Sequence, residues 1–257
     1  MVAQCTLEVF AFEIIRAMLD LITILNHCHH HSGFVYHHAR FGPDKKSIEV
    51  RLRPRAGSAA VCSGRHRPAP GYDHLPERRF EFIPLLGFLV FFLYSMRRVQ
   101  CRSCGVVVVE EVPWSDGKHQ LTKAYMLFLA RWARKLSWKE TAETFHTSWD
   151  QVCFAVEYVV GWGLDHRKLA PIRAIGVDEM HRADEENRPH VAYPSRAAAQ
   201  LFQGQEAVSS GVVEGLNNKA KVTMRRSYGF RTFRILELAL YHSLGKLPEP
   251  ELTHEFF

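Results

Sequence analysis

The stretch FIPLLGFLVFFLY, residues 82–94, is the most membrane-like run of this sequence. Its 13 residues fall short of the roughly 17 to 25 that a membrane-spanning helix needs, and Pro84 and Gly87 interrupt it. Its phenylalanine and valine content and the arginines on either side favour two strands joined by a turn. We therefore expect a buried β-hairpin here, and no membrane partner.

The composition of the whole chain is typical of a folded protein with an acidic partner. The 257 residues are 47% hydrophobic and 12% aromatic, enough for two or three small domains. The formal net charge of +6 favours nucleic acid as a partner, although a modest basic excess also serves solubility. Six cysteines without a secretory leader pattern argue against a secreted disulfide scaffold, so we expect the protein to lie in the reducing cytoplasm.

The first 45 residues carry no assignable function. Residues 1–31 begin with a helix-like apolar pattern and end in HCHHH, residues 27–31. A histidine-rich tract can bind metal, but a single nearby cysteine without paired spacing is more typical of an incidental surface tract. The next clear element is SIEVRLRP, residues 47–54, whose alternation predicts a strand.

A cysteine pair after the hairpin predicts a zinc site. Cys101 and Cys104 stand in the order C-x-x-C-G, which lets two thiolates face one Zn²⁺ from a tight turn. Cys62 can supply a third ligand, but position 65, where a fourth cysteine would complete the set, is Arg. His66 is therefore the expected fourth ligand, with His74 as an alternative. The other interpretation is a hairpin whose thiols bind nothing.

Three helices are predicted after residue 116. LTKAYMLFLARWARKL, residues 121–136, has one apolar stripe, and Ser137 with Glu140 forms a capping box that opens a second helix. That helix should end near residue 145, and His146 falls where a positive φ is usual. A third helix, capped by Thr147 or Ser148, should run through residue 160.

The three-residue turn between the second and third helices, with small Ala142 where they approach, indicates a helix-turn-helix. In that interpretation Lys139 holds phosphates and the start of the third helix reaches base edges. The base-reading residues would be Ser148, Trp149, Asp150 and Gln151. A plain three-helix bundle is the alternative.

Two carboxylates further along the chain stand in contexts that suit a metal site. AIGVDEM, residues 174–180, brings Asp178 to the end of an apolar, strand-like segment. Glu214 lies in SSGVVEGLNNKAKVTMRRSYGFR, residues 209–231, where it shares one predicted helix face with Asn218, Lys221 and Arg225. A solvated basic helix would show the same spacing.

Taken in order, these motifs resemble the ISL-type insertion-sequence transposases over residues 46–257. These bacterial enzymes have a zinc ribbon, a helix-turn-helix and a catalytic DDE domain of ribonuclease H-like fold. The resemblance implies that Asp178 is the first catalytic acid and Glu214 the last, and that they hold Mg²⁺ for an in-line phosphoryl displacement. It further implies double-stranded DNA of element-end inverted repeats as the partner, Lys221 and Arg225 as DNA contacts, a homo-oligomer, and a place at the bacterial nucleoid.

The middle acid of such a site is missing. A three-stranded meander and a crossover helix need on the order of 45 residues before it, but only 35 residues separate Asp178 from Glu214. The acids between them follow no buried strand: Asp184, Glu185, Glu186 and Glu206. We therefore expect an internal deletion, an incomplete magnesium site and loss of strand transfer.

The predicted fold class is multidomain α+β. We expect an unassigned segment 1–45, a small β zinc ribbon 46–115, an all-α helix-turn-helix 116–170 and a truncated ribonuclease H-like α/β remnant 171–257. The leading functional prediction is a transposase-family DNA-binding protein without strand transfer. The alternatives are an active enzyme that completes its metal site in an oligomer, and a DNA-binding regulator of transposition.

Overall fold

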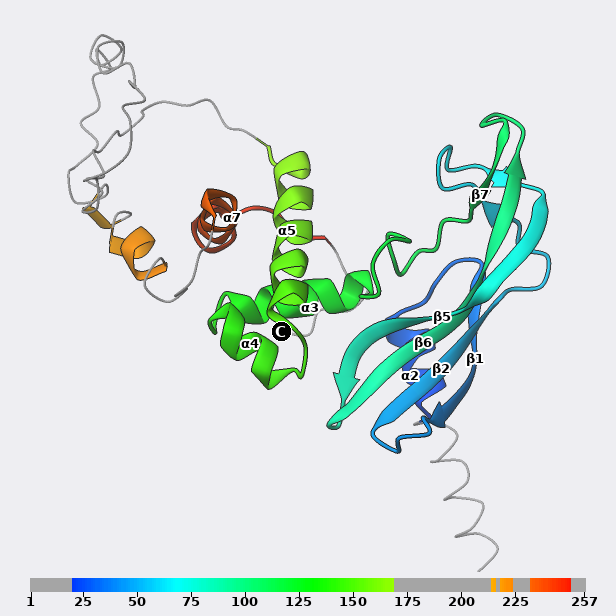
Figure 1. Ribbon diagram of the computed structural model, residues 1–257, viewed down its shortest axis with the longest axis horizontal. Coiled ribbons are helices and arrows are strands. Elements are labelled where there is room, and N and C mark those ends of the chain that lie inside the picture. The colour runs from blue at the N-terminus through cyan, green and yellow to red at the C-terminus, as the bar shows by residue number, and fades with distance from the viewer. Residues whose placement is uncertain (1–19, 169–213, 216–217, 224–231, 251–257) are drawn as a thin grey trace, which may run out of the picture. The chain divides into compact units, whose positions relative to one another are not determined.

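The computed structural model describes residues 20–168, 214–215, 218–223 and 232–250 (Figure 1). The chain divides into two compact units, Met1–Trp162 with Glu249–Phe257, and Gly163–Pro248. Each unit is described by itself. In the described residues the fold is mixed α/β, with a sheet that contains both parallel and antiparallel pairs.

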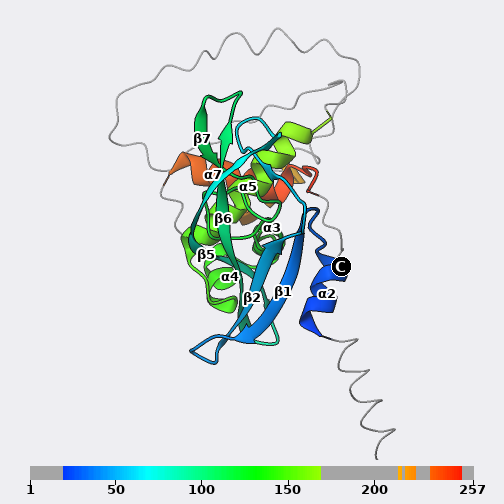
Figure 2. The ribbon, with the colours of Figure 1, turned by 90° about the vertical axis from the view of Figure 1, so that its right-hand side faces the viewer.

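The first unit is built on a five-stranded sheet in the order β1-β2-β6-β5, with β7 paired to β6 (Figure 2). Its strands are β1 (Phe34–Phe41), β2 (Ser47–Pro54), β5 (Gly71–Leu85), β6 (Phe88–Cys101) and β7 (Val106–Val109). The pair β2 with β6 is parallel, and the other pairs are antiparallel. Two short strands, β3 (Ala60–Val61) and β4 (Pro68–Ala69), form a second small sheet.

The hairpin predicted from residues 82–94 is present and longer than expected. Leu85 pairs with Phe88, so the β5–β6 loop has two residues, Leu86 and Gly87. Their φ angles are 51° and 83°, and two positive values in a two-residue loop are typical of a type I′ turn. Within the described part of the chain, no helix is both long and apolar enough to cross a membrane.

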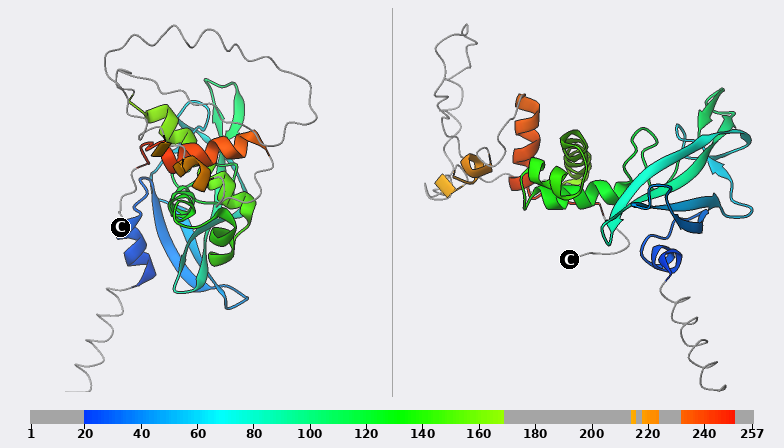
Figure 3. Two further views of the ribbon diagram at one scale, coloured as in Figure 1. Left: turned by 90° about the vertical axis from the view of Figure 1, so that its left-hand side faces the viewer. Right: turned by 60° about the horizontal axis from the view of Figure 1, so that its bottom comes forward.

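One face of the sheet forms the core because alternate residues of the central strands are apolar. Phe80 and Phe82 of β5 lie against Phe92 of β6, and the rings of Phe82 and Phe92 stack with centroids 4.6 Å apart. Trp114 is also buried in this cluster. Helix α2 (Leu21–Cys28) packs against β1, and α3 (Lys123–Ala133) packs against β5 (Figures 2 and 3). Residues 34–41, for which the sequence predicts no element, form an edge strand of the sheet.

The three predicted helices are α3 (Lys123–Ala133), α4 (Trp138–Thr144) and α5 (Trp149–His166). The predicted capping box is confirmed, because the Ser137 side chain accepts from the Glu140 amide and the Glu140 carboxylate accepts from the Ser137 amide. His146 has φ 53°, as expected for its position. Helix α4 therefore ends where the sequence places its end.

In the second unit the described residues are helical, apart from residues 167–168 and the loops on either side of residues 233–244. Helix α7 (Phe233–Leu244) begins at Thr232, whose side chain accepts from the Ile235 amide. Residues 214–215 and 218–223 are also helical. The strand predicted before Asp178 lies outside the described residues.

Candidate metal centre and nucleic-acid interface

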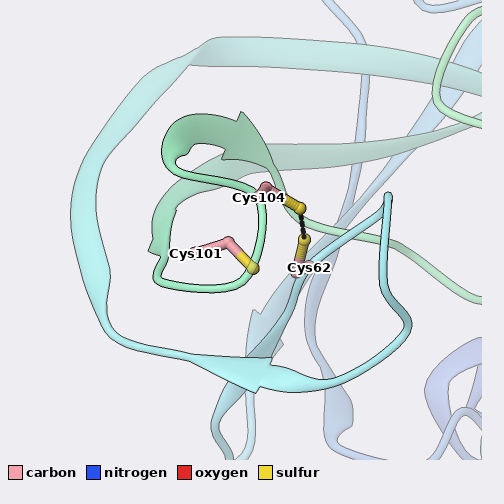
Figure 4. Close-up of side chains that lie close together, drawn as sticks. All are labelled: Cys62, Cys101 and Cys104. Atoms are coloured by element: carbon pink, nitrogen blue, oxygen red, sulfur yellow. Dashed lines mark hydrogen bonds between the residues drawn. The ribbon is translucent and has the colours of Figure 1, made fainter.

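Three cysteines from two separate loops converge beside the sheet (Figure 4). Their sulfur atoms lie within 4.8 Å of one another, and the Cys62 and Cys104 sulfurs are 3.7 Å apart. Two sulfurs bound to one tetrahedral zinc, each about 2.3 Å from the metal, lie about 3.8 Å apart. Cys62, Cys101 and Cys104 therefore have the donor type and the spacing that suit a metal such as zinc.

The two loops have nearly the same backbone. In the second loop the amides of Cys104 and Gly105 donate to the Cys101 carbonyl at 3.2 and 2.9 Å. In the first loop the amides of Arg65 and His66 donate to the Cys62 carbonyl at 3.4 and 2.8 Å. Arg65 thus occupies the position that Cys104 has in its own loop.

This equivalence explains where His66 lies. His66 takes the place of Gly105, and both have a positive φ, 53° and 70°. Its ring Nδ1 lies 2.7 Å from a Glu111 carboxylate oxygen, and its side chain is 72% exposed. The structure therefore brings three of the four predicted zinc ligands together, and His66 does not join them.

The thiols of the cluster influence one another. Hydrogen bonds from Cys104, first from its backbone amide and then from its side chain, lower the pKa of Cys101. The pKa of Cys104 is raised to about 11, chiefly because its side chain bonds to Cys101. In the absence of metal, the cluster therefore favours one thiolate over several.

A buried ion pair supports the end of β6 next to the cysteine loops. Glu110 accepts from the Tyr94 hydroxyl at 2.6 Å and from the Arg97 amide at 2.6 Å, and it pairs with the Arg97 guanidinium at 2.7 Å. The Glu110 side chain is fully buried, and Glu110 forms a β-bridge to Cys62. Sequence reasoning missed this pair, since its only signal is a glutamate directly after the apolar run of residues 106–109.

The junction between α4 and α5 has two defined caps. The Thr147 amide donates to the Ala142 carbonyl at 2.9 Å and the His146 amide to the Glu143 carbonyl at 3.4 Å, which is the Schellman pattern. At the start of α5 the Ser148 hydroxyl accepts from the Gln151 amide at 3.2 Å. Ala142 is buried, as its predicted role requires.

The predicted DNA-contacting residues of this region differ in their exposure and in the contacts that they already make within the protein. Lys139 is 81% exposed, with Glu143 at 3.9 Å, and Asp150 is exposed. Trp149 is only half-buried but packs against Trp138, with ring centroids 5.7 Å apart. The Gln151 side-chain oxygen accepts from the Thr147 hydroxyl and, at 3.4 Å, from the Ser148 amide.

The predicted catalytic residues are described only in part. Glu214 and Lys221 are helical and exposed. Asp178 and Arg225 lie outside the described residues.

One comparison with known proteins bears on this second unit. Residues 195–240 match the family model of the ISL3 transposase domain, and the matched range includes Glu214 and Lys221. The chain matches no curated protein and no solved structure. The match agrees with the resemblance drawn from the sequence motifs, and it supports an insertion-sequence transposase.

Proposed function

We propose that this chain is a transposase-derived DNA-binding protein of an insertion sequence, which recognises element-end DNA and has lost strand transfer. The observation that carries the proposal is the α4–α5 junction. Its Schellman end, the buried Ala142 and the cap at Ser148 fix two short-linked helices at a defined turn. A helix-turn-helix needs such a turn to present its second helix to the major groove.

In this proposal α5 is the recognition helix and α4 crosses the phosphate backbone. The exposed ammonium of Lys139 would neutralise a phosphate, which adds affinity without sequence information. The amide nitrogen of Gln151 would donate to a base edge while its oxygen stays with Thr147 and Ser148. Ser148 and Asp150 stand next to it on the same first turn.

The metal centre would act as the structural zinc site of the predicted zinc-ribbon domain. Cys62 precedes the long β5–β6 hairpin, Cys101 is its last residue, and Cys104 follows it. A bound zinc would cross-link the start and end of that hairpin, so it would stabilise the unit that carries α3, α4 and α5 up to Trp162.

Loss of strand transfer is proposed from chain length. The 35 residues between Asp178 and Glu214 are too few for the strands and helix that would hold a middle acid. Magnesium would then meet two carboxylates at most from one chain. The alternative is a complete site formed in a homo-oligomer.

DNA binding is tested by selecting duplexes from a random pool with the full chain and measuring their affinity against scrambled duplexes. We expect enrichment of one motif, and an affinity that falls steeply with salt. Lys139→Ala should weaken all duplexes alike and reduce the salt slope by about one. Lys168→Ala, which removes an exposed lysine beyond the other end of α5, is the matched control. No enrichment with the wild type would overturn the proposal.

The lost activity is tested on the selected duplex with Mg²⁺ or Mn²⁺. We expect no strand cleavage. Cleavage that disappears in Asp178→Ala would establish an active enzyme, and its dependence on protein concentration would distinguish a site shared between protomers. If the chain instead binds element ends and only lowers cleavage by an intact transposase, the regulator interpretation applies.

A further inference from the structure

A leucine occupies a strained and fully exposed position at the turn between β5 and β6. Leu86 has φ 51° and is 89% exposed. Type I′ turns favour Asn-Gly, because both central residues need positive φ and a bulky side chain makes that conformation costly. A buried leucine could offset the cost by packing, but Leu86 packs against almost nothing. The residue is therefore unfavourable for the fold itself.

Leu86 belongs to a larger apolar group, which we call the apolar tip: the exposed Phe41, Leu85 and Leu86, and the half-buried Phe88. Phe41 at the end of β1 is 63% exposed, and its ring centroid lies 5.4 Å from that of Phe88. The Leu89 amide donates to the Lys46 carbonyl, so the β1–β2 turn and the β5–β6 turn are neighbours. Figure 1 shows both turns at the lower end of the sheet.

Positive charge borders the apolar tip. Lys45 and Lys46 are exposed in the β1–β2 turn. The one acid of that turn, Asp44, is held by the Ser47 hydroxyl at 2.7 Å and by the amides of Lys46 and Ser47. An apolar projection with the exposed ammonium groups of Lys45 and Lys46 beside it complements a groove lined by phosphates.

We propose that the apolar tip is a DNA wedge: it enters the minor groove, inserts Leu86 between two base pairs and kinks the duplex, while Lys45 and Lys46 contact phosphates. Apolar side chains, leucine among them, act in this way in proteins that bend DNA through the minor groove. The inference rests on the proposed DNA binding, because the tip and the α4–α5 junction belong to the same compact unit. It adds a second contact that bends DNA and does not depend on base reading by α5.

The decisive variant is Leu86→Asn. Asparagine before Gly87 suits the turn better than leucine, so this variant should fold at least as stably as the wild type. The probe is a duplex of about 30 base pairs with a central TA step, which kinks easily. A dye pair at its ends reports bending, and 2-aminopurine at the step reports unstacking.

We expect the wild type to raise both energy transfer and 2-aminopurine fluorescence, and Leu86→Asn to abolish both changes. The affinity of the variant should be roughly tenfold weaker, the order expected when one leucine side chain is no longer buried. Leu86→Met keeps an apolar wedge and should bend DNA. Tyr72→Asn removes an exposed aromatic residue near the opposite end of β5 and should change neither signal.

Other occupants of the tip give other results. If Leu86→Asn bends DNA as the wild type does, the wedge is wrong. The wedge is also wrong if the variant only loses binding to phosphatidylserine vesicles, or only shifts from dimer to monomer in sedimentation velocity, with bending unchanged. If the wild type binds no duplex at all, the proposed function fails together with this inference. Wild-type binding without bending overturns the wedge alone.

Discussion

Ser148 and Gln151 cap the first turn of α5 reciprocally. The Ser148 hydroxyl accepts from the Gln151 amide at 3.2 Å, and the Gln151 side-chain oxygen lies 3.4 Å from the Ser148 amide nitrogen. This is the capping-box arrangement, which uses Glu or Gln at the third helical position. Gln151 therefore has a structural role in addition to the base contact predicted from its place in the sequence.

The two roles of Gln151 are separable by substitution. Gln151→Ala should lower the free energy of unfolding by about 1 kcal/mol, because one side of the cap is lost. Gln151→Glu keeps the accepting oxygen, so its stability should stay near that of the wild type. Chemical denaturation of both variants measures the difference.

If the Gln151 amide nitrogen reads a base, both variants should lose preference for the selected duplex over scrambled DNA, by about 1 to 3 kcal/mol. If Gln151→Glu retains the full preference, Gln151 only caps the helix and the base contact is wrong.

Arg65→Cys should tighten zinc binding. The loop that carries Arg65 already has the backbone hydrogen bonds of the loop that carries Cys104, so a thiolate at position 65 needs no new turn. Four thiolates complete a Cys₄ set, whereas Arg65 brings a permanent positive charge close to the metal. Zinc release to a graded series of chelators at fixed pH measures the change, since thiolate ligands make the affinity pH-dependent.

His66→Ala tests whether His66 is the fourth zinc ligand. The His66 ring is bonded to Glu111 and lies outside the cysteine cluster, so its removal should leave zinc affinity unchanged. A wild-type protein that holds one zinc as firmly as Arg65→Cys, together with a large loss in His66→Ala, would restore His66 as a ligand.

Glu110→Ala should destabilise the first unit by about 3 to 5 kcal/mol, because it leaves the mostly buried Arg97 guanidinium without its carboxylate. Removing both charges in Arg97→Met with Glu110→Leu should cost less than the sum of the single changes. Urea unfolding of the wild type, Arg97→Met, Glu110→Leu and the double variant gives the coupling. Strict additivity would show that the pair contributes nothing as a pair.

The histidine at position 31 should make the protein sensitive to mild acid. Burial, followed by the charges of His29, His30 and Lys123, lowers the pKa of His31 to about 4. A base whose pKa is depressed on folding contributes stability above its ordinary pKa of 6.5, and that stability is lost as the pH falls towards 4. His31→Phe keeps an aromatic ring against Tyr36 and Trp114 and should flatten this part of the stability curve. An unchanged slope between pH 6.5 and 4 would contradict the assignment.

Local signals predicted the local structure well. The β5–β6 hairpin, the capping box at Ser137 and the positive φ at His146 depend on residues a few positions apart, and all are confirmed. Strand β2 was likewise predicted from its own alternation. Each of these elements is determined by short-range sterics and hydrogen bonds, which can be inferred from a single sequence.

What the sequence could not predict depends on distant partners. Strand β1 carries His37, His38 and Arg40 in its second half, a pattern that is readable as a strand only when β2 is beside it. The Arg97–Glu110 pair arises because β7 folds back on β6. His66 has a ligand's residue type, but the backbone turn places it where a glycine stands in the other loop, so its ring points to Glu111.

The parallel pairing of β2 with β6 also has a consequence during synthesis. The β1–β2 hairpin is complete at residue 54, but the strand that β2 needs on its other side ends its pairing only at Leu93, 39 residues later. At about 5 to 20 residues per second, a ribosome takes roughly 2 to 8 s over that distance. For those seconds β2 lacks the strand that pairs with it in the folded protein, so its backbone N–H and C=O groups and its apolar side chains stay accessible to chaperones.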